Sequence, residues 1–154
     1  MASLIICKSV HHNNTMKLAQ AMAEVLACDI IEPAEVNDDI LNEHDLIGIG
    51  SGIYNGAHHP TILKMIERIG DHPQKRAFVF STSTICLKRM HETILSALNN
   101  KGFKIIGEFQ CRGFMTYSFT KYLLGGLNKG KPNERDLEKA KNFANEMLTK
   151  IKTK

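Results

Sequence analysis

The sequence has no tryptophan, few prolines, four cysteines and no apolar run long enough to cross a membrane. The cysteines never stand in the C-x-x-C spacing of a zinc or redox pair, so we expect free, buried thiols in a reducing compartment. The short apolar run near the N-terminus has no basic leader before it and predicts a buried strand rather than a signal peptide. We therefore expect a cytoplasmic protein without a membrane partner.

The chain also lacks a strong excess of charge of either sign. Its 154 residues include 20 Lys and Arg against 16 Asp and Glu, which gives a net charge of +4. Nucleic-acid binding usually requires a clustered basic stripe, so the composition argues against such a partner. The 43% apolar content excludes a disordered or fibrous chain, and the length fits a single domain over residues 1–154.

Short apolar runs alternate with segments of helical periodicity along the whole chain. The predicted strands are Leu4–Cys7, Asp29–Glu32, Asp45–Ser51, Arg76–Ser81 and Phe103–Cys111. The predicted helices are Thr15–Ala27, a helix opening at Pro60 and stopping at Gly70, Leu87–Asn100, and a last one with Asn133 as N-cap. This order favours an α/β fold with a parallel sheet covered on both faces, either flavodoxin-like or a Rossmann half. Both arrangements place ligands at the carboxyl ends of the strands.

The first loop at that edge, Ser9–Thr15, is rich in hydroxyl and amide side chains and has no carboxylate. Backbone N–H groups and a helix dipole hold a phosphate, and Ser, Thr or Asn side chains add donors. The loop lacks the G-x-G-x-x-G and Gly-Lys-Ser/Thr patterns, which fits a monophosphate that is bound but not transferred. A polar turn with an ordinary helix cap at Asn14 or Thr15 explains the same residues equally well.

Three further loops carry candidate binding groups. Asn55-Gly56 predicts a turn, because both residues accept positive φ, and holds Tyr54 at a loop tip where it can stack on a planar ring. The hydroxyls of Ser81–Thr84 can bond the polar edge of a heterocycle. The long stretch Arg112–Pro132 is irregular and aromatic, which is typical of a functional loop. Every tyrosine of the chain falls in these loops; a hydrophobic lid over an ordinary core would show the same pattern.

Together these features resemble the flavodoxin family over nearly the whole chain. Asn14-Thr15 matches the end of the family's phosphate loop, Ser/Thr-x-Thr-Gly-Asn-Thr. The two adjacent histidines of this loop, His11 and His12, resemble one branch of flavodoxin-like proteins. In that branch a segment similar to Gly125–Asn133 also precedes the last helix. The chain departs from the family pattern at Asn13 and Asn55, which stand where glycine is expected. Asparagine tolerates the left-handed conformation that these positions need.

The resemblance implies a flavodoxin-like three-layer sandwich, with a five-stranded parallel sheet of order 2-1-3-4-5, and non-covalent FMN. It assigns the phosphate to Ser9, His11, His12, Asn13, Asn14 and Thr15, the flavin ring to the loop of Ser51, Gly52, Ile53, Tyr54, Asn55 and Gly56, and the pyrimidine edge to Thr82, Ser83 and Thr84. A second aromatic wall would come from Tyr117, Phe119 or Tyr122. The implied function is electron transfer with a redox partner protein or a small-molecule acceptor, by a monomer or weak dimer.

Two other functional classes stay open. An FMN-dependent oxidoreductase, either a quinone reductase or a protoporphyrinogen-oxidase-like enzyme, would turn over NAD(P)H or another substrate. A binding domain that has lost FMN would keep only the scaffold.

The histidines suggest a further site. The pairs His11-His12 and His58-His59 follow neighbouring strands, but a metal site is disfavoured because no carboxylate or cysteine stands nearby. We expect one histidine of each pair to line the flavin site and the other to be solvated, and His91 to be a surface or boundary residue of its helix.

Overall fold

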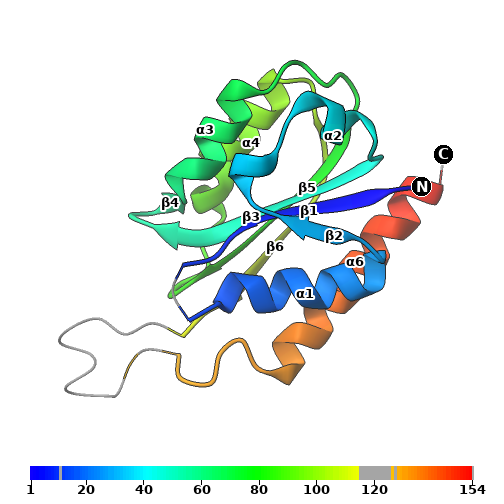
Figure 1. Cartoon of the computed structure of the whole chain (residues 1–154). Helices are drawn as coiled ribbons and strands as arrows, with labels where there is room; N and C mark the ends of the chain where they lie inside the picture. The colour runs from blue at the N-terminus through cyan, green and yellow to red at the C-terminus, as the bar shows by residue number, and fades with distance from the viewer. Residues whose placement is uncertain (11, 115–125, 127, 154) are drawn as a thin grey trace.

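The computed structural model describes residues 1–10, 12–114, 126 and 128–153 (Figure 1). Its five parallel strands are β1 (Ser3–Lys8), β2 (Asp29–Ile31), β3 (Leu46–Tyr54), β5 (Arg76–Ser83) and β6 (Lys104–Arg112). They are ordered β2-β1-β3-β5-β6, so the predicted 2-1-3-4-5 order is confirmed. A short strand, β4 (Ala57–His58), pairs antiparallel with the end of β3.

Helices cover both faces of this sheet (Figure 1). The long helices are α1 (Asn14–Leu26) and α6 (Glu134–Lys152) on one face, and α3 (Pro60–Arg68) and α4 (Glu92–Asn100) on the other. The shorter elements are η1 (Pro33–Glu35), α2 (Asp38–Asn42) and η2 (Lys88–His91). No helix in the described part of the chain is long and apolar enough to span a bilayer.

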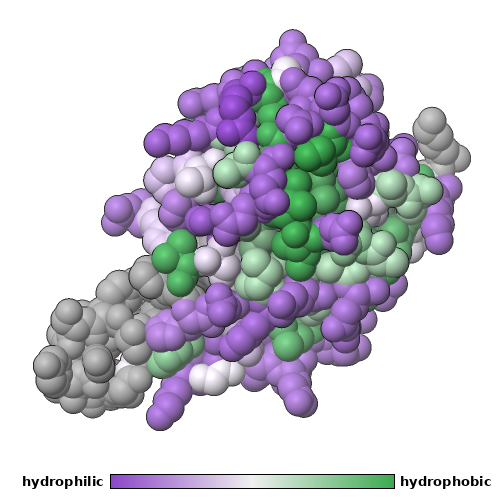
Figure 2. Space-filling view, viewed as in Figure 1, coloured by the Kyte–Doolittle hydropathy of each residue, from purple (hydrophilic) through white to green (hydrophobic). Residues whose placement is uncertain are grey.

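The side chains of β1 point alternately to the two faces of the sheet, which explains why its sequence is an unbroken apolar run. Ile5 and Cys7 pack into the core beneath α1 and α6, whereas Leu4 and Ile6 pack into the second core beneath α3. A strand buried on both faces has no solvent-facing positions left for polar residues. At the sheet edge the covering is thinner: Figure 2 shows a hydrophobic band near α2 and β2, where Ile31 and Ile40 are only partly buried.

The segment after Ser51 differs from the prediction. Residues 52–54 were predicted to be a loop, but β3 continues to Tyr54, which pairs with Ala57 across a two-residue turn. The predicted Asn55-Gly56 turn is confirmed, with φ of 51° and 79°. Because the turn closes a hairpin, it extends the strand that precedes it.

Two predicted helix starts were also wrong. The segment from Leu87 begins as the 3₁₀ turn η2, and the α-helix starts only at Glu92. Helix α1 is capped by neither Asn14 nor Thr15: its N-cap is Asn13, in the left-handed conformation with φ 51° and without a side-chain cap bond. At α6 the predicted cap is confirmed, because Asn133 and Asp136 form a reciprocal capping box.

Glycines in β3 make room for phenylalanine rings of β5. A Cβ built on Gly50 would lie 2.4 Å from the Phe80 ring, which stands opposite it in the ladder. We expect Gly50→Ala to destabilise the fold by about 1–3 kcal/mol, as overpacked cores do. Urea unfolding measures this change. Adding Phe80→Leu should recover part of the loss; an equal or greater loss in the double variant would contradict the packing explanation.

The four cysteines are free, as predicted, but they are not all buried. Burial raises the pKa of the Cys7 and Cys111 thiols to about 12 and that of the half-buried Cys28 to about 11. Cys86 is exposed on the loop between β5 and η2, so the prediction of a buried thiol was wrong at this position.

Candidate functional site

A polar pocket lies where the carboxyl ends of β1, β3, β5 and β6 meet. Its lining comprises Ser9, Val10, Asn14, Thr15, Gly52, Ile53, Tyr54, Thr82, Ser83, Thr84 and Gly113. No carboxylate lines it, and its volume of about 20 Å³ is close to the space of a single water. The predicted loops therefore converge, but they enclose little empty space.

The start of α1 presents unpaired donors to this pocket. Met16 N–H donates to Ser9 Oγ at 3.3 Å, whereas the backbone N–H groups of Asn14 and Thr15 have no acceptor among the described residues. The first turn carries no acidic residue. Unpaired N–H groups and the positive end of the helix dipole together favour an anion here.

Asn14 adds an unpaired acceptor. Its Nδ2 donates to the carbonyl of Phe114 at 2.7 Å, which fixes the orientation of the amide. Its Oδ1 is buried and has no partner within the described part of the chain. Gly113 permits this arrangement, because a Cβ there would lie 2.7 Å from Asn14 Nδ2. A buried acceptor without a donor is rare, so this position is suited to a ligand hydroxyl or imide.

The floor of the pocket joins α1 to β5. Thr15 Oγ1 and Thr82 Oγ1 share a buried hydrogen bond of 2.7 Å. On the next loop, Asn128 Nδ2 donates to the carbonyl of Thr84 at 3.0 Å and ties the segment before α6 to the end of β5. These bonds make the hydroxyl-rich walls a fixed surface rather than a set of loose loops.

Tyr54 closes the pocket from the hairpin side. Its ring folds back over Gly52, where a Cβ would meet the Tyr54 hydroxyl at 2.9 Å. Burial raises the pKa of the phenol, and a hydrogen bond from the Val10 backbone opposes that rise. The ring also meets His59 edge-on, with centroids 5.2 Å apart. A planar ligand at this position therefore requires Tyr54 to turn away from Gly52.

Beside the pocket, on the α3 and α4 side of the sheet, lies a buried polar network that the sequence did not reveal. His91, which was predicted to be a surface or boundary residue, is fully buried: Nε2 bonds Ser81 Oγ at 2.7 Å and Nδ1 bonds Glu108 Oε2 at 2.9 Å. The His58 ring lies 4.9 Å from that of His91, and its Nδ1 bonds Ser51 Oγ at 2.9 Å. The prediction for His91 assumed a continuous α-helix from Leu87, but His91 lies in the 3₁₀ turn η2, which directs its side chain toward the sheet.

The hydrogen bonds of Ser51 assign the tautomer of His58. Ser51 Oγ donates to the carbonyl of Gly52 and accepts the His59 N–H, so His58 Nδ1 is the donor and Nε2 an acceptor. That Nε2 is buried with no partner among the described residues. Burial, and then the charge of His91, lower the pKa of His58 to about 3. Burial also lowers the pKa of His91, opposed by Glu108.

The set Ser81, His91 and Glu108 has the contact distances of a hydrolytic triad. Ser81 is only 1% exposed and is absent from the lining of the pocket, so no substrate carbonyl can reach its hydroxyl. The network therefore supports the β3–β4 hairpin, through Ser51 and His58, rather than forming a nucleophile.

The other predicted site residues that the structure describes do not line the pocket. His12 and Asn13 are exposed, and the His12 ring packs against Phe114 at 4.6 Å. Asn55 and Gly56 form the exposed tip of the hairpin. Ser51 belongs to the histidine network, as described above. His11, Tyr117, Phe119 and Tyr122 lie outside the described residues.

The expectation that one histidine of each pair lines the pocket was wrong for His58-His59. His58 is buried in the network, and His59 caps α3 by accepting the Thr61 N–H. Among the described residues, no three His, Cys, Asp or Glu side chains are placed to share a metal ion. The sequence did not single out Val10 or Gly113, although both lie in or beside the predicted loops.

Comparisons with known proteins agree with this geometry. A family model described as a flavodoxin domain matches residues 4–113. The uncharacterized protein MJ0298 of Methanocaldococcus jannaschii is 48% identical over 150 residues, which cover 96% of this chain and 99% of that protein. The curated relative therefore carries no established activity to compare.

The fold is similar to those of several solved flavodoxins. Oxidised flavodoxin 2 from Bacillus cereus has a TM-score of 0.70 at 20% identity, over 97% of this chain and 99% of that one. A flavodoxin from the domain Archaea has a TM-score of 0.68 at 15% identity over 99% of both chains. The Fusobacterium nucleatum flavodoxin bound to flavin mononucleotide has a TM-score of 0.67 at 14% identity, over 97% of this chain and 99% of that one.

Proposed function

The chain belongs to the flavodoxin family, and on that premise we propose that it binds FMN without a covalent bond and carries electrons between redox partners. The observation that carries the proposal is the pocket at the start of α1: its lining holds no carboxylate, and the backbone N–H groups of Asn14 and Thr15 have no acceptor among the described residues. A phosphate monoester is the part of FMN that such a donor set recognises.

The remaining groups of the pocket fit the rest of FMN. The unpaired Oδ1 of Asn14 is an acceptor for a ribityl hydroxyl, and the threonine hydroxyls of β5 and its following loop supply donors and acceptors beside it. Bound FMN supplies reversible electron acceptance, while the chain binds and orients it and limits its contact with water. Tyr54, once turned off Gly52, supplies the apolar cover for the ring.

The simplest experiment is a visible spectrum of the purified protein, followed by titration of the apo-protein with FMN and riboflavin. We expect flavin absorbance, release of FMN on denaturation and a much higher affinity for FMN than for riboflavin. A colourless protein that binds neither flavin would instead favour a binding domain that has lost FMN.

Tyr54→Ala should weaken FMN and riboflavin by the same factor, on the order of 10-fold, because stacking of an aromatic side chain on a planar base contributes about 1–3 kcal/mol. Isothermal titration of both flavins checks this result. Tyr54→Phe keeps the ring and loses the hydroxyl that accepts the hydrogen bond from Val10, so it should bind close to normally. A loss restricted to FMN would show that Tyr54 acts on the phosphate and not on the ring.

A further inference from the structure

The carboxyl edge of the sheet is surrounded by loops without acidic residues. The sequence has no Asp or Glu in residues 1–23, 46–66, 72–91 or 109–133. These ranges contain the loops that follow β1, β3, β5 and β6. The loops around the pocket therefore contribute cations and no anions.

Several of these cations are unpaired. Lys8 is neutralised by Glu32 at 2.9 Å, and Lys131 by Asp136 at 3.0 Å. Four exposed cations make no side-chain hydrogen bond or ion pair with any described residue: Lys88, Arg89, Arg112 and Lys129. Their charge is available to a partner.

Two cations at the opposite edge are held differently. Lys75 Nζ donates to the carbonyl of His44 at 2.8 Å, and Lys150 Nζ donates to that of Ile106 at 2.8 Å. Both side chains are tied to the protein's own backbone. These two cations of the opposite edge are therefore engaged, whereas Lys104, also at that edge, is exposed and makes no side-chain bond with a described residue.

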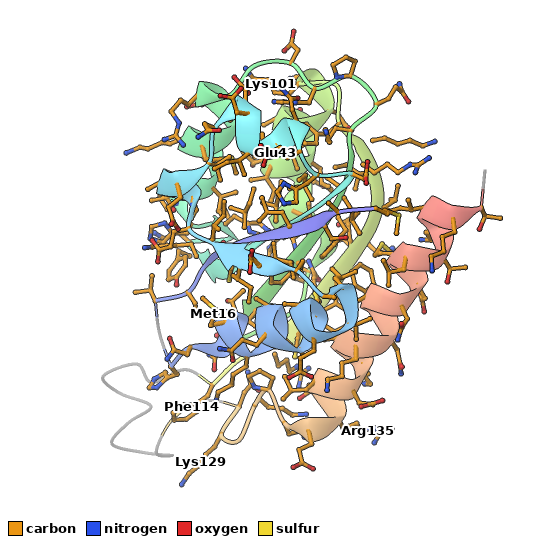
Figure 3. All side chains as sticks on the ribbon, turned by 45° about the vertical axis from the view of Figure 1, so that its right-hand side comes forward. Met16, Glu43, Lys101, Phe114, Lys129 and Arg135 are labelled. Atoms are coloured by element: carbon orange, nitrogen blue, oxygen red, sulfur yellow. The ribbon has the colours of Figure 1, made fainter. Side chains whose placement is uncertain are left out.

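The unpaired cations flank the pocket. Arg112 ends β6 opposite Ser83, which lines the pocket. The bond from Asn128 to Thr84 places Lys129 beside the loop that leads into η2, the element that carries Lys88 and Arg89. Figure 3 shows Lys129 and Phe114 at the same end of the molecule as Met16, near the start of α1.

Exposed apolar side chains accompany this charge. Val10 is 50% exposed and Ile85 58% exposed, and each lies in a loop at this edge. The acidic side chains that flank the edge, such as Glu92 and Glu134, begin helices, where the dipole favours them. Val10 and Ile85 therefore add exposed apolar area to the edge that carries the unpaired cations, and a docked protein would cover both.

We propose that this edge, defined by Val10, Ile85, Lys88, Arg89, Arg112 and Lys129, docks a redox protein with an acidic surface. Complementary charge raises the rate of encounter and selects the partner, and it positions that partner over the pocket. The proposal rests on the proposed function, because the flavin would lie under the docked protein. The cations are too few and too dispersed to form the continuous basic stripe that nucleic acid requires.

The test measures binding of apo-protein to an acidic ferredoxin by isothermal titration at low and high salt, with Arg112→Glu and Lys104→Glu as matched variants. Both residues are exposed on β6, one at the carboxyl end and one at the amino end. We expect binding at low salt that is lost at high salt, about 10-fold weaker binding for Arg112→Glu, and less than a 2-fold change for Lys104→Glu.

Equal effects of the two variants, or no salt-dependent binding, would overturn the docking surface. Tighter binding to a short DNA duplex than to ferredoxin would also overturn it. FMN binding is measured separately on the same samples. If FMN does not bind but ferredoxin binding follows the expected charge dependence, the proposed function fails and the surface stands.

Discussion

Replacing Ser9 by aspartate is expected to lower the affinity for FMN at least roughly 100-fold while changing that for riboflavin only a few-fold, because like charges in contact cost several kcal/mol. The new carboxylate would stand beside the first turn of α1, where the phosphate is proposed to bind. The fold should survive, because a carboxylate can accept the Met16 N–H as the Ser9 hydroxyl does, and anions stabilise helix starts. Titration calorimetry with both flavins measures the two affinities.

Ser9→Asn is the matched control, since it has nearly the same size as aspartate but no charge. It should retain FMN within about 10-fold, the cost of one altered hydrogen bond. If aspartate and asparagine weakened FMN equally, or if riboflavin fell as far as FMN, the phosphate would not lie at the start of α1.

Acid should destabilise the protein through the buried histidines, even where no carboxyl group titrates. The folded-state pKa of His58 is about 3, below its usual value of 6.5. The stability that the neutral His58 side chain contributes is therefore fully present above pH 6.5. It is lost as the pH falls toward 3, because in this range only the unfolded chain takes up the proton. The slope for one such group approaches about 1.4 kcal/mol per pH unit, so between about pH 6.5 and 4.5 the loss reaches about 2–3 kcal/mol.

His58→Asn isolates this contribution, because the asparagine amide can still donate to Ser51 Oγ but does not titrate. Urea unfolding at both pH values should show that the free energy of unfolding falls less in the variant than in the wild type, by about 2–3 kcal/mol. Contributions from carboxyl groups cancel in this difference. Parallel pH profiles would mean that His58 is not held neutral in the folded protein.

The sheet order and its helical layers were predictable because they rest on burial pattern. Strands such as β1 are buried on both faces, and the capping residues of α6 mark its start without tertiary context. The extension of β3 to Tyr54 was not predictable from the same pattern, since its last residues are only partly buried. Only the cross-strand pairing with Ala57 makes them a strand.

The candidate site shows the same division. The loops at the carboxyl edge converge because parallel strands all end at that edge. The strand order alone therefore predicts that Thr15 and Thr82, which share a hydrogen bond, lie close together. The bonding of His91 was different, because its partners Ser81 and Glu108 come from two other elements. A single histidine in a helical pattern carries no sign of partners that tertiary packing supplies.

The accessibility of Cys86 has a practical consequence. The raised pKa values of Cys7, Cys28 and Cys111 keep these thiols protonated at neutral pH, and Cys7 and Cys111 are also buried. Maleimide reagents should therefore modify Cys86 selectively. A fluorophore attached to Cys86 would lie two residues from Lys88, so its emission should change when another protein docks at this edge. The measurement needs no introduced cysteine.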